Sequence, residues 1–224
     1  MPYFSIAIDG PAGAGKSTIA KQIAKRLGFI YVDTGAMYRA MALYFIRNNI
    51  DASDSESIEK SCDKIDITIE YQEGEQIVLL NGENVNGLIR TEQVGNMASA
   101  VSVNRTVRLK LVQLQRMLAE KSNVIMDGRD IGTYVLPNAD LKIYLTASTQ
   151  VRAQRRFKEL EQKGIQADIA SIEKDIIERD QRDMNREFAP LRQAEDAIYL
   201  DSSDMTIEEV VNYIIGLYQE KTAG

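Results

Sequence analysis

Histidine is absent from the 224 residues of this chain, and cysteine occurs once, as Cys62. A mechanism that needs a histidine base is therefore excluded. An intramolecular disulfide is excluded as well, which fits a reducing compartment such as the cytoplasm. No apolar run approaches the ~20 residues of a membrane-spanning helix. An apolar segment follows Met1 at once, and we therefore expect neither a signal peptide nor a membrane partner.

Positive charge is also in short supply, with 27 lysines and arginines against 33 acidic residues. This balance disfavours a broad nucleic-acid-binding surface, and we expect no nucleic-acid partner. If the chain binds anions, its arginines must be concentrated locally. The length is ordinary for a single α/β domain with one substantial core.

What the sequence does contain is a phosphate-binding pattern near its start. The pattern G-x-x-x-x-G-K-[ST] is matched in full by Gly10, Pro11, Ala12, Gly13, Ala14, Gly15, Lys16 and Ser17. Residues 3–8 predict a buried strand and residues from 17 onward predict a helix, which is the context that a P-loop requires. A glycine turn that only packs a helix on a strand is the alternative, and the complete match disfavours it. We therefore expect backbone N–H groups around a phosphate chain, with Lys16 at the β- and γ-phosphates and Ser17 at Mg²⁺.

Strand-like runs alternate with helical patterns along most of the chain. Further strands are predicted at residues 29–32, 124–126, 141–145 and 198–200, and a helix at 36–47. The run Thr206 to Glu209 has the form of a capping box that starts a last helix. This alternation predicts an α/β fold of the P-loop NTPase type, with a five-stranded parallel sheet flanked by helices.

One segment, at about residues 65–88, interrupts this alternation. Apolar and polar residues alternate there, and turn signals occur at Glu73-Gly74 and Asn81-Gly82. Such turns between alternating runs predict hairpins. We therefore expect a small antiparallel β insert within one domain.

Many chemistries use a P-loop, and the arginines help to choose among them. The N-K-x-D motif of regulatory GTPases is absent, which leaves transporter-type ATPases, small-molecule kinases and nucleotide kinases. Two groups of residues have helical spacing: Arg152, Arg155 and Arg156, and then Arg179, Arg182, Asp183 and Arg186. Taken alone, these groups are typical of solvated helix faces with salt bridges. The isolated Arg39, Arg108 and Arg129 are harder to explain in that way.

Arg39 and Arg129 lie in segments that resemble the bacterial cytidylate kinase family, and the resemblance runs along the whole chain. The segments are Asp33 to Arg39 (D-T-G-A-M-Y-R), Arg90 to Ser99, Asp127 to Thr133 (D-G-R-D-I-G-T), Glu178 to Arg186 and Ala189 to Leu191. The resemblance implies transfer of the γ-phosphoryl group of ATP to CMP or dCMP. It also implies one domain over 1–224, with a core at about 1–35, 91–150 and 187–224. The monophosphate-binding region with its β insert would be at about 36–90, and a short helical lid at about 151–168.

On the ATP side, the resemblance implies that residues 10–18, including Thr18, hold the phosphates. Arg152, Arg155 and Arg156, with the turn at Lys163-Gly164, would form a lid that closes over ATP. Arg155 is the favoured arginine for reaching the transferred phosphoryl group. Lys16, Arg129, Arg155 and Arg186 would then be the catalytic residues. Asp33 and Asp127 follow strands, so each could reach magnesium through water or cap a helix.

On the CMP side, the resemblance assigns Arg39, Arg129 and Arg186 to the phosphate, where guanidinium forks suit phosphate oxygens. It assigns Ser99, Arg108 and Asp130 to cytosine, with Asp130 accepting from the amine. Arg179 and Asp183 would hold the sugar, although a plain ion pair between them is an alternative. Thr34 and Tyr38, from the same matched segments, complete the expected CMP site.

Two other functions stay open at this point. A small-metabolite kinase of the shikimate-kinase type would share the loop and core, but it would need no cytosine site. A non-catalytic module would bind ATP without turning it over. No exposed apolar stripe is evident in the sequence, and we therefore expect a monomer.

Overall fold

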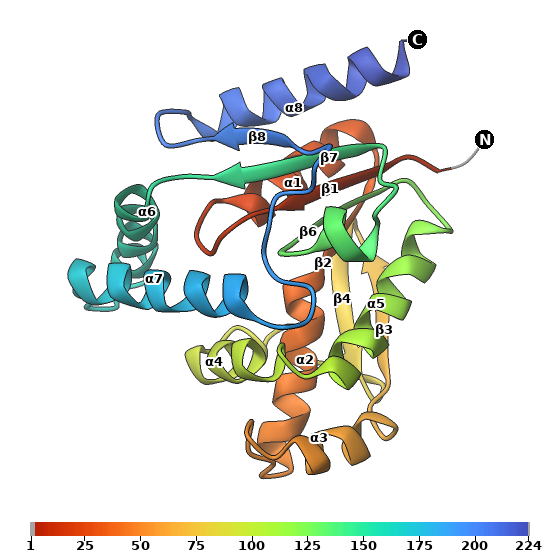
Figure 1. The fold of residues 1–224 in the computed structure, drawn as a ribbon, viewed down its shortest axis with the longest axis vertical. Helices are drawn as coiled ribbons and strands as arrows, with labels where there is room; N and C mark the ends of the chain where they lie inside the picture. The colour runs from red at the N-terminus through yellow and green to blue at the C-terminus, as the bar shows by residue number, and fades with distance from the viewer. Residues whose placement is uncertain (1–2, 224) are drawn as a thin grey trace.

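A computed structural model describes residues 3–223 of the chain. Its central sheet has five strands in the order β2-β6-β1-β7-β8, and every neighbouring pair is parallel (Figure 1). The strands are β1 (Ser5–Asp9), β2 (Ile30–Asp33), β6 (Val124–Gly128), β7 (Leu141–Thr146) and β8 (Ile198–Asp201). The predicted five-stranded parallel sheet is therefore confirmed.

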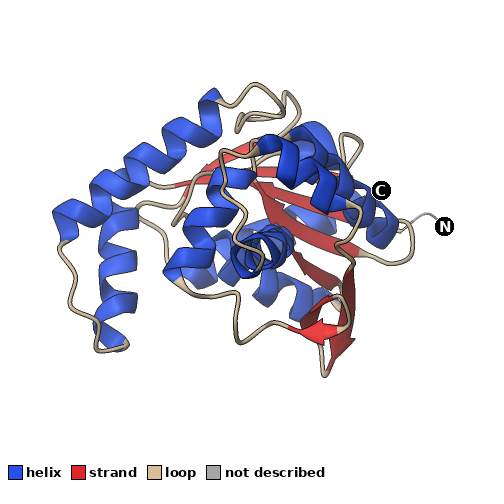
Figure 2. Cartoon of the chain, turned by 90° about the horizontal axis from the view of Figure 1, so that it is seen from below, coloured by secondary structure: helices blue, strands red, loops and turns tan. Residues whose placement is uncertain are grey.

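Helices cover both faces of this sheet (Figure 2). In the described chain they are α1 (Lys16–Leu27), α2 (Thr34–Arg47), α3 (Ser55–Cys62), α4 (Glu92–Val101), α5 (Arg105–Ala119), α6 (Thr149–Gln162), α7 (Ile169–Asn185), α8 (Ile207–Thr222) and a short π-helix, η1 (Ile131–Val135). The capping box expected at the start of α8 is present, with Thr206 and Glu209 as its two members. No helix within residues 3–223 is both long and apolar enough to cross a membrane.

The two faces of β1 build two separate cores, because successive side chains of a strand point to opposite sides. Ile6 and Ile8 pack with α1 and α8, whereas Ala7 packs with α2 and α5 on the other face. All three are fully buried. Burial of one such isoleucine side chain is worth about 1.5–3 kcal/mol. This packing fixes the carboxyl end of β1, where the phosphate-binding loop begins.

The predicted antiparallel insert is also present, with β3 (Ile67–Gln72), β4 (Glu75–Leu80) and β5 (Glu83–Asn84) in that spatial order. Both turns use left-handed residues, with φ of 52° and 81° at Glu73-Gly74 and of 49° and 82° at Asn81-Gly82. Positive φ at both central residues is the property of the turn type that joins twisted strands. The insert contacts the edge strand β2 through Gln76, whose amide bonds the backbone N–H and carbonyl of Asp33 at 2.9 and 3.3 Å.

The prediction that Arg179, Arg182, Asp183 and Arg186 share one helical face is wrong in part. Helix α7 ends at Asn185, and Arg186 is extended, with φ −64° and ψ 140°. Arg182 is exposed and donates to the carbonyl of Glu178 within its own helix. The chain turns after Asn185, so Arg186 reaches the interior from a loop.

Candidate active site

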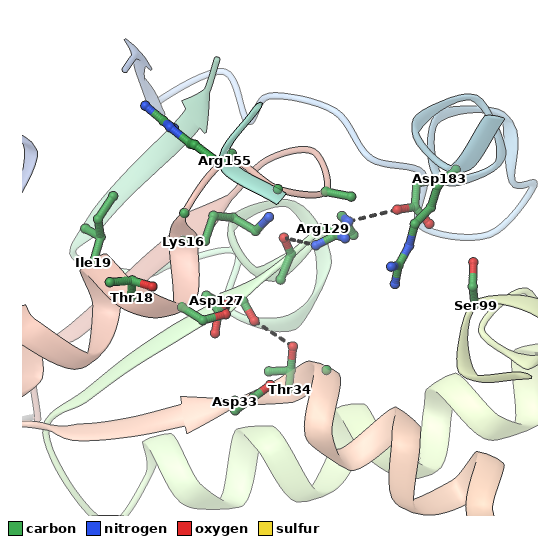
Figure 3. A pocket seen from close by; sticks show the side chains of 18 of the residues that line it. Lys16, Thr18, Ile19, Asp33, Thr34, Ser99, Asp127, Arg129, Arg155 and Asp183 are labelled. Carbon is green, nitrogen blue, oxygen red and sulfur yellow. Dashed lines mark hydrogen bonds and ion pairs between the residues drawn. The ribbon is translucent and has the colours of Figure 1, made fainter. Parts of the chain in front are cut away.

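A cleft of about 560 Å³ opens at the carboxyl ends of β1, β2 and β6. Ligands of open α/β sheets bind at this edge, and the volume suits a small-molecule site. Residues expected for ATP and for CMP line the same cleft (Figure 3). They are Ala12, Gly13, Ala14, Gly15, Lys16, Ser17, Thr18, Thr34, Tyr38, Arg39, Ser99, Arg108, Arg129, Asp130, Arg155, Arg179, Asp183 and Arg186. Gly10, Pro11 and Arg156 are outside its lining.

The loop between β1 and α1 has a backbone that only glycine adopts easily. Gly13 and Gly15 have φ of 76° and 85°, in the left-handed region. Gly10 has φ 151°, and a Cβ there would lie 1.9 Å from the carbonyl oxygen of Leu145 on β7. Glycine therefore lets the loop pass close to the sheet before it opens onto the N-terminus of α1.

Lys16 is a buried cation at the first turn of α1, with 5% of its surface exposed. Its Nζ donates to the carbonyl oxygen of Pro11 at 2.7 Å. Burial lowers the pKa of Lys16 well below its usual value, and the nearby charge of Arg129 lowers it further. A buried ammonium beside a second cation is stabilised by an anion, so this part of the cleft suits a negatively charged ligand.

Ser17 and Asp127 place two side-chain oxygens that could bind a metal ion near Lys16. The Ser17 hydroxyl donates to Asp127 at 2.8 Å, and the Tyr31 hydroxyl donates to the other carboxylate oxygen at 2.8 Å. Burial raises the pKa of Asp127, and the negative charge of Asp33 adds to the effect. Residues 3–223 hold no cluster of three or more metal-ligating side chains. The pair fits Mg²⁺ whose remaining ligands are water and phosphate oxygens, as is usual for this ion.

Asp33 caps a helix and also holds two arginines. Its carboxylate accepts from the N–H of Ala36 at 2.8 Å at the start of α2, and it pairs with Arg39 at 3.4 Å and Arg90 at 2.7 Å. Burial favours protonation, but these two guanidinium groups outweigh it and hold the pKa of Asp33 below its usual range. The capping role expected as one alternative for Asp33 is present.

Arg39, Arg129 and Arg179 bring three cations close together in the cleft, and Arg129 is also near Lys16. The Nε atoms of Arg39 and Arg179 are buried without a hydrogen-bond partner among the described residues. Burial lowers the pKa of Arg179 to about 10, with the charge of Arg129 as the next cause. Buried donors without partners are costly, and an anion placed between these side chains would satisfy them.

Asp183 pairs with Arg129, at 2.8 Å, rather than with Arg179 (Figure 3). Burial raises the pKa of this carboxyl, but Arg129 more than offsets the effect and keeps the pKa below the usual range. The ion pair between Arg179 and Asp183 that the spacing allowed is absent from residues 3–223. Arg179 is therefore left with donors directed at the cleft.

A second polar cluster lies deeper, around Asp130. One of its carboxylate oxygens accepts from Arg108, which is 1% exposed, and the other accepts from Arg186 at 3.1 Å. The ring of Tyr38 lies under the Arg108 guanidinium, 5.4 Å away, and the buried hydroxyl of Ser99 has no partner in the described chain. Arg186 also donates to the carbonyl of Ala189, and its bond to Asp130 places its guanidinium beside the expected base-binding residues.

The three arginines of α6 have three different environments. Arg152 is buried and joins the P-loop to α7, because it donates to Ala12 at 2.8 Å and to Asp180 at 2.6 Å. Arg155 donates to Ser202 after β8, at 2.7 Å, and in Figure 3 it points away from Arg129. Arg156 is exposed and pairs with Glu159. The interpretation as a solvated helix face is therefore right for Arg156 and wrong for Arg152.

The sequence reasoning missed two residues, one that lines the cleft and one that lies behind it. Arg90 lies at the rim of the cleft and pairs with Asp33, although the sequence had flagged only the segment that begins with it. Asp9, the last residue of β1, is buried and accepts two backbone hydrogen bonds from η1. Its position directly before the P-loop was the available signal, because a charged residue at the end of a buried strand needs partners.

Comparisons with known proteins agree with this geometry. The sequence profile of the family described as cytidylate kinase matches residues 6–220. The chain is 53% identical to the cytidylate kinase of Caldicellulosiruptor bescii, over 97% of this chain and 96% of that protein. It is 48% identical to the cytidylate kinase of Halalkalibacterium halodurans, over 99% and 100%. A gluconokinase from Sinorhizobium meliloti shares the fold at 13% identity, with a TM-score of 0.51 over 100% of this chain and 97% of that one. The chain belongs to the cytidylate kinase family.

Proposed function

We propose that this protein transfers the γ-phosphoryl group of ATP to CMP or dCMP, giving ADP and CDP or dCDP. The observation that carries the proposal is one continuous cleft that is lined both by the buried P-loop lysine and by half-buried and buried arginines. Membership of the cytidylate kinase family supports it independently.

The ATP phosphates would be held by the backbone of residues 10–18, with Lys16 at the transferred group. Ser17 and Asp127 would hold Mg²⁺, which neutralises charge on the phosphates when it is bound. Lys16 supports this assignment because its side chain is buried and donates to a backbone carbonyl, with no ion pair to a carboxylate within the described part of the chain. The terminal phosphate would supply the missing negative charge.

The CMP phosphate would be held by Arg39 and Arg129, with Arg179 beside them. The unpartnered Nε atoms of Arg39 and Arg179 support this place for the phosphate. Arg179 and Asp183 remain the candidates for the sugar, since both lie next to Arg129 and line the cleft.

Cytosine would be recognised by Asp130, Arg108 and Ser99. Asp130 accepts from the exocyclic amine, and the unpartnered hydroxyl of Ser99 adds a polar contact. Uracil carries an oxygen where cytosine has the amine, and it would place a lone pair against the carboxylate. Arg186 would support Asp130 from the side opposite Arg108, while its expected role at the phosphate remains a prediction.

The reaction asks the protein for positioning and charge stabilisation rather than for covalent chemistry. The acceptor oxygen of CMP is already anionic, so a histidine-free chain lacks nothing that is needed. Arg155, held at Ser202 in this structure, would have to leave that carbonyl to reach the phosphoryl group. Arg156 would approach ATP only with a similar movement of α6.

The decisive experiment is ADP formation with and without a nucleoside monophosphate. With Mg-ATP, we expect rapid ADP release with CMP and dCMP, slow release with UMP and almost none with AMP or GMP. ADP release that is indifferent to every monophosphate would contradict the kinase proposal and favour a simple ATPase. Transfer to shikimate or a sugar alone would favour the small-metabolite alternative, and ATP binding without turnover would favour the non-catalytic module.

Two further expectations from the sequence remain predictions, a monomeric state and a location in the cytoplasm. Light scattering of the purified protein tests the first, with a mass near 25.1 kDa expected.

A further inference from the structure

Asp9 is a buried carboxylate that does not line the cleft. It ends β1, the central strand of the sheet, and only 4% of its surface is exposed. One carboxylate oxygen accepts from the backbone N–H of Ile131 and the other from that of Gly132, both at 2.7 Å. Two short bonds of this kind to one carboxylate are charge-assisted and fix the donor segment firmly.

The two N–H groups belong to the first residues of η1, which follows Asp130 directly. Asp130 occupies the capping position of η1, but within the described chain its side chain makes no capping bond. Its two carboxylate oxygens bond Arg108 and Arg186 instead. Asp9 therefore does the capping from another strand, and the Asp130 carboxylate is not needed for it.

The contact is tight at Gly132. A Cβ there would lie 3.3 Å from Asp9 and 3.1 Å from the Cδ atom of Lys142 on β7. In the parallel pair of β1 and β6, Asp9 is in register with Gly128. The chain leaves β6 at Gly128 and turns back over the end of β1, where Asp9 holds it.

We propose that Asp9 is a positioning residue for base recognition, which sets the place of Asp130 and Arg129 by anchoring the start of η1. The proposal rests on the assignment of CMP as the acceptor. Asp9 also precedes Gly10, so the P-loop and the base-binding loop share one anchor. Burial and, to a lesser extent, the negative charge of Asp130 raise the pKa of Asp9 to about 7. The two N–H groups and the positive charge of Lys16 lower this pKa, but they do not offset the effect of burial.

The test compares Asp9→Asn with the wild-type enzyme at pH 8. The amide keeps one acceptor and turns a donor toward the second N–H, so the start of η1 must shift. We expect kcat/KM for CMP to fall on the order of tenfold or more, mainly through KM, and the CMP/UMP preference to fall with it. ATP affinity, measured by calorimetry, should change by less than about threefold.

Gly132→Ala provides a second variant, which leaves the carboxylate in place and crowds the same contact from the other side. We expect the same shift in KM and in base preference. The matched control is Asp54→Asn, which alters a carboxylate that caps α3, accepting from Ser57 at 3.0 Å, away from the cleft. It should leave KM and the CMP/UMP ratio unchanged.

Two outcomes would overturn the positioning role. One is an unchanged CMP/UMP ratio in both Asp9→Asn and Gly132→Ala. The other is a loss of ATP affinity as large as the loss for CMP. Failure of the underlying assignment is distinguishable, because the wild-type protein itself would then show no CMP-dependent ADP formation.

Discussion

The proposed ATP half of the cleft comes from one stretch of chain, residues 10–18, whereas the proposed CMP half is assembled from α2, α4, α5, the loop after β6, and α7 with the residue beyond it. The ATP half would bind mainly through a backbone shape that glycines at a strand end allow. The CMP half consists of side chains that pair with one another, such as Arg129 with Asp183 and Arg108 with Asp130.

Because of this difference, substitutions should affect the two halves in different ways. A local loop can lose one side chain and keep its backbone donors. In the paired network, removing one side chain also leaves its buried partner without a hydrogen-bond or ion-pair partner, which costs more than the lost bond alone. We therefore expect substitutions in the ATP half to reduce mainly the rate of phosphoryl transfer. Substitutions in the CMP half should reduce both the affinity for CMP and the stability of the fold.

The largest effect should come from Lys16→Ala. The variant should lose phosphoryl transfer by several orders of magnitude, because the charge at the transferred group is removed. Melting temperature should stay near that of the wild-type protein, since Lys16 bonds only a loop carbonyl. Lys25→Ala, at an exposed site on the same helix, is the control and should retain full activity. Residual activity within tenfold of wild type would contradict the assignment.

A large effect on stability is expected where the two halves meet, at Asp9. Its pKa of about 7, raised mainly by burial from 3.8, means that the folded state binds the proton more tightly than the unfolded state. The resulting stabilisation is complete below about pH 4 and is lost as pH rises through 7, a change of roughly 4 kcal/mol. Urea unfolding across pH 4–8 measures it as the difference between the wild type and Asp9→Asn. A difference that does not vary with pH would contradict the raised pKa.

Arg129→Ala should chiefly weaken the use of CMP. It removes a proposed phosphate ligand and leaves Asp183 buried without its partner. We expect a cost of about 2–4 kcal/mol for CMP, or roughly thirty- to a thousandfold. ATP affinity should remain largely intact. Calorimetric titration decides the point, and an equal loss for ATP would show that Arg129 serves the other phosphate.

Asp130→Asn tests base selection within the CMP half. Cytosine loses a charge-assisted bond, an effect of about 1.5–3 kcal/mol, or roughly ten- to more than a hundredfold in kcat/KM. Uracil should lose less, because the amide can donate to its O4, and the CMP/UMP ratio should therefore fall. Some loss of stability is also expected, since Arg108 and Arg186 both depend on this carboxylate. Steady-state kinetics on both nucleotides measure the ratio, and an unchanged ratio would remove Asp130 from the base site.

The smallest effect should come from Gln76→Ala, outside the cleft. The Gln76 amide holds the β insert against Asp33, which in turn orients Arg39 and Arg90. Loss of about 1 kcal/mol would raise KM for CMP by roughly fivefold and leave ATP affinity unchanged. Gln72→Ala, at an exposed position on β3, should have no effect. A Gln76→Ala enzyme with wild-type KM would mean that the insert does not help to position the CMP half.

Much of the frame could be predicted from the sequence because its signals are local. Alternation of apolar runs predicted the five parallel strands, and the pairs Glu73-Gly74 and Asn81-Gly82 predicted the turns of the insert. The capping box at Thr206 likewise predicted the start of α8. Each of these signals depends on neighbours within a few residues, and local propensity and packing agree there.

The place of Arg186 could not be predicted in this way. Helical spacing put it on one face with Arg179, but the chain leaves the helix at Asn185 and brings Arg186 to Asp130. The buried position of Arg152 could not be predicted either, because its partners Ala12 and Asp180 are 140 and 28 residues away in sequence. Ion pairs over such separations are set by the packing of α6, α7 and the sheet.

The sequence by itself determined that a phosphate-binding loop follows a buried strand, because glycine, lysine and serine act there through the local backbone. The tertiary structure alone decided which charges are paired and which await a ligand. Asp9 illustrates the difference: it is adjacent to the P-loop in sequence, yet its carboxylate bonds Ile131 and Gly132, more than a hundred residues later. A buried charge takes whatever donors the fold brings to it, since leaving it unpaired is costly, and only the folded chain specifies those donors.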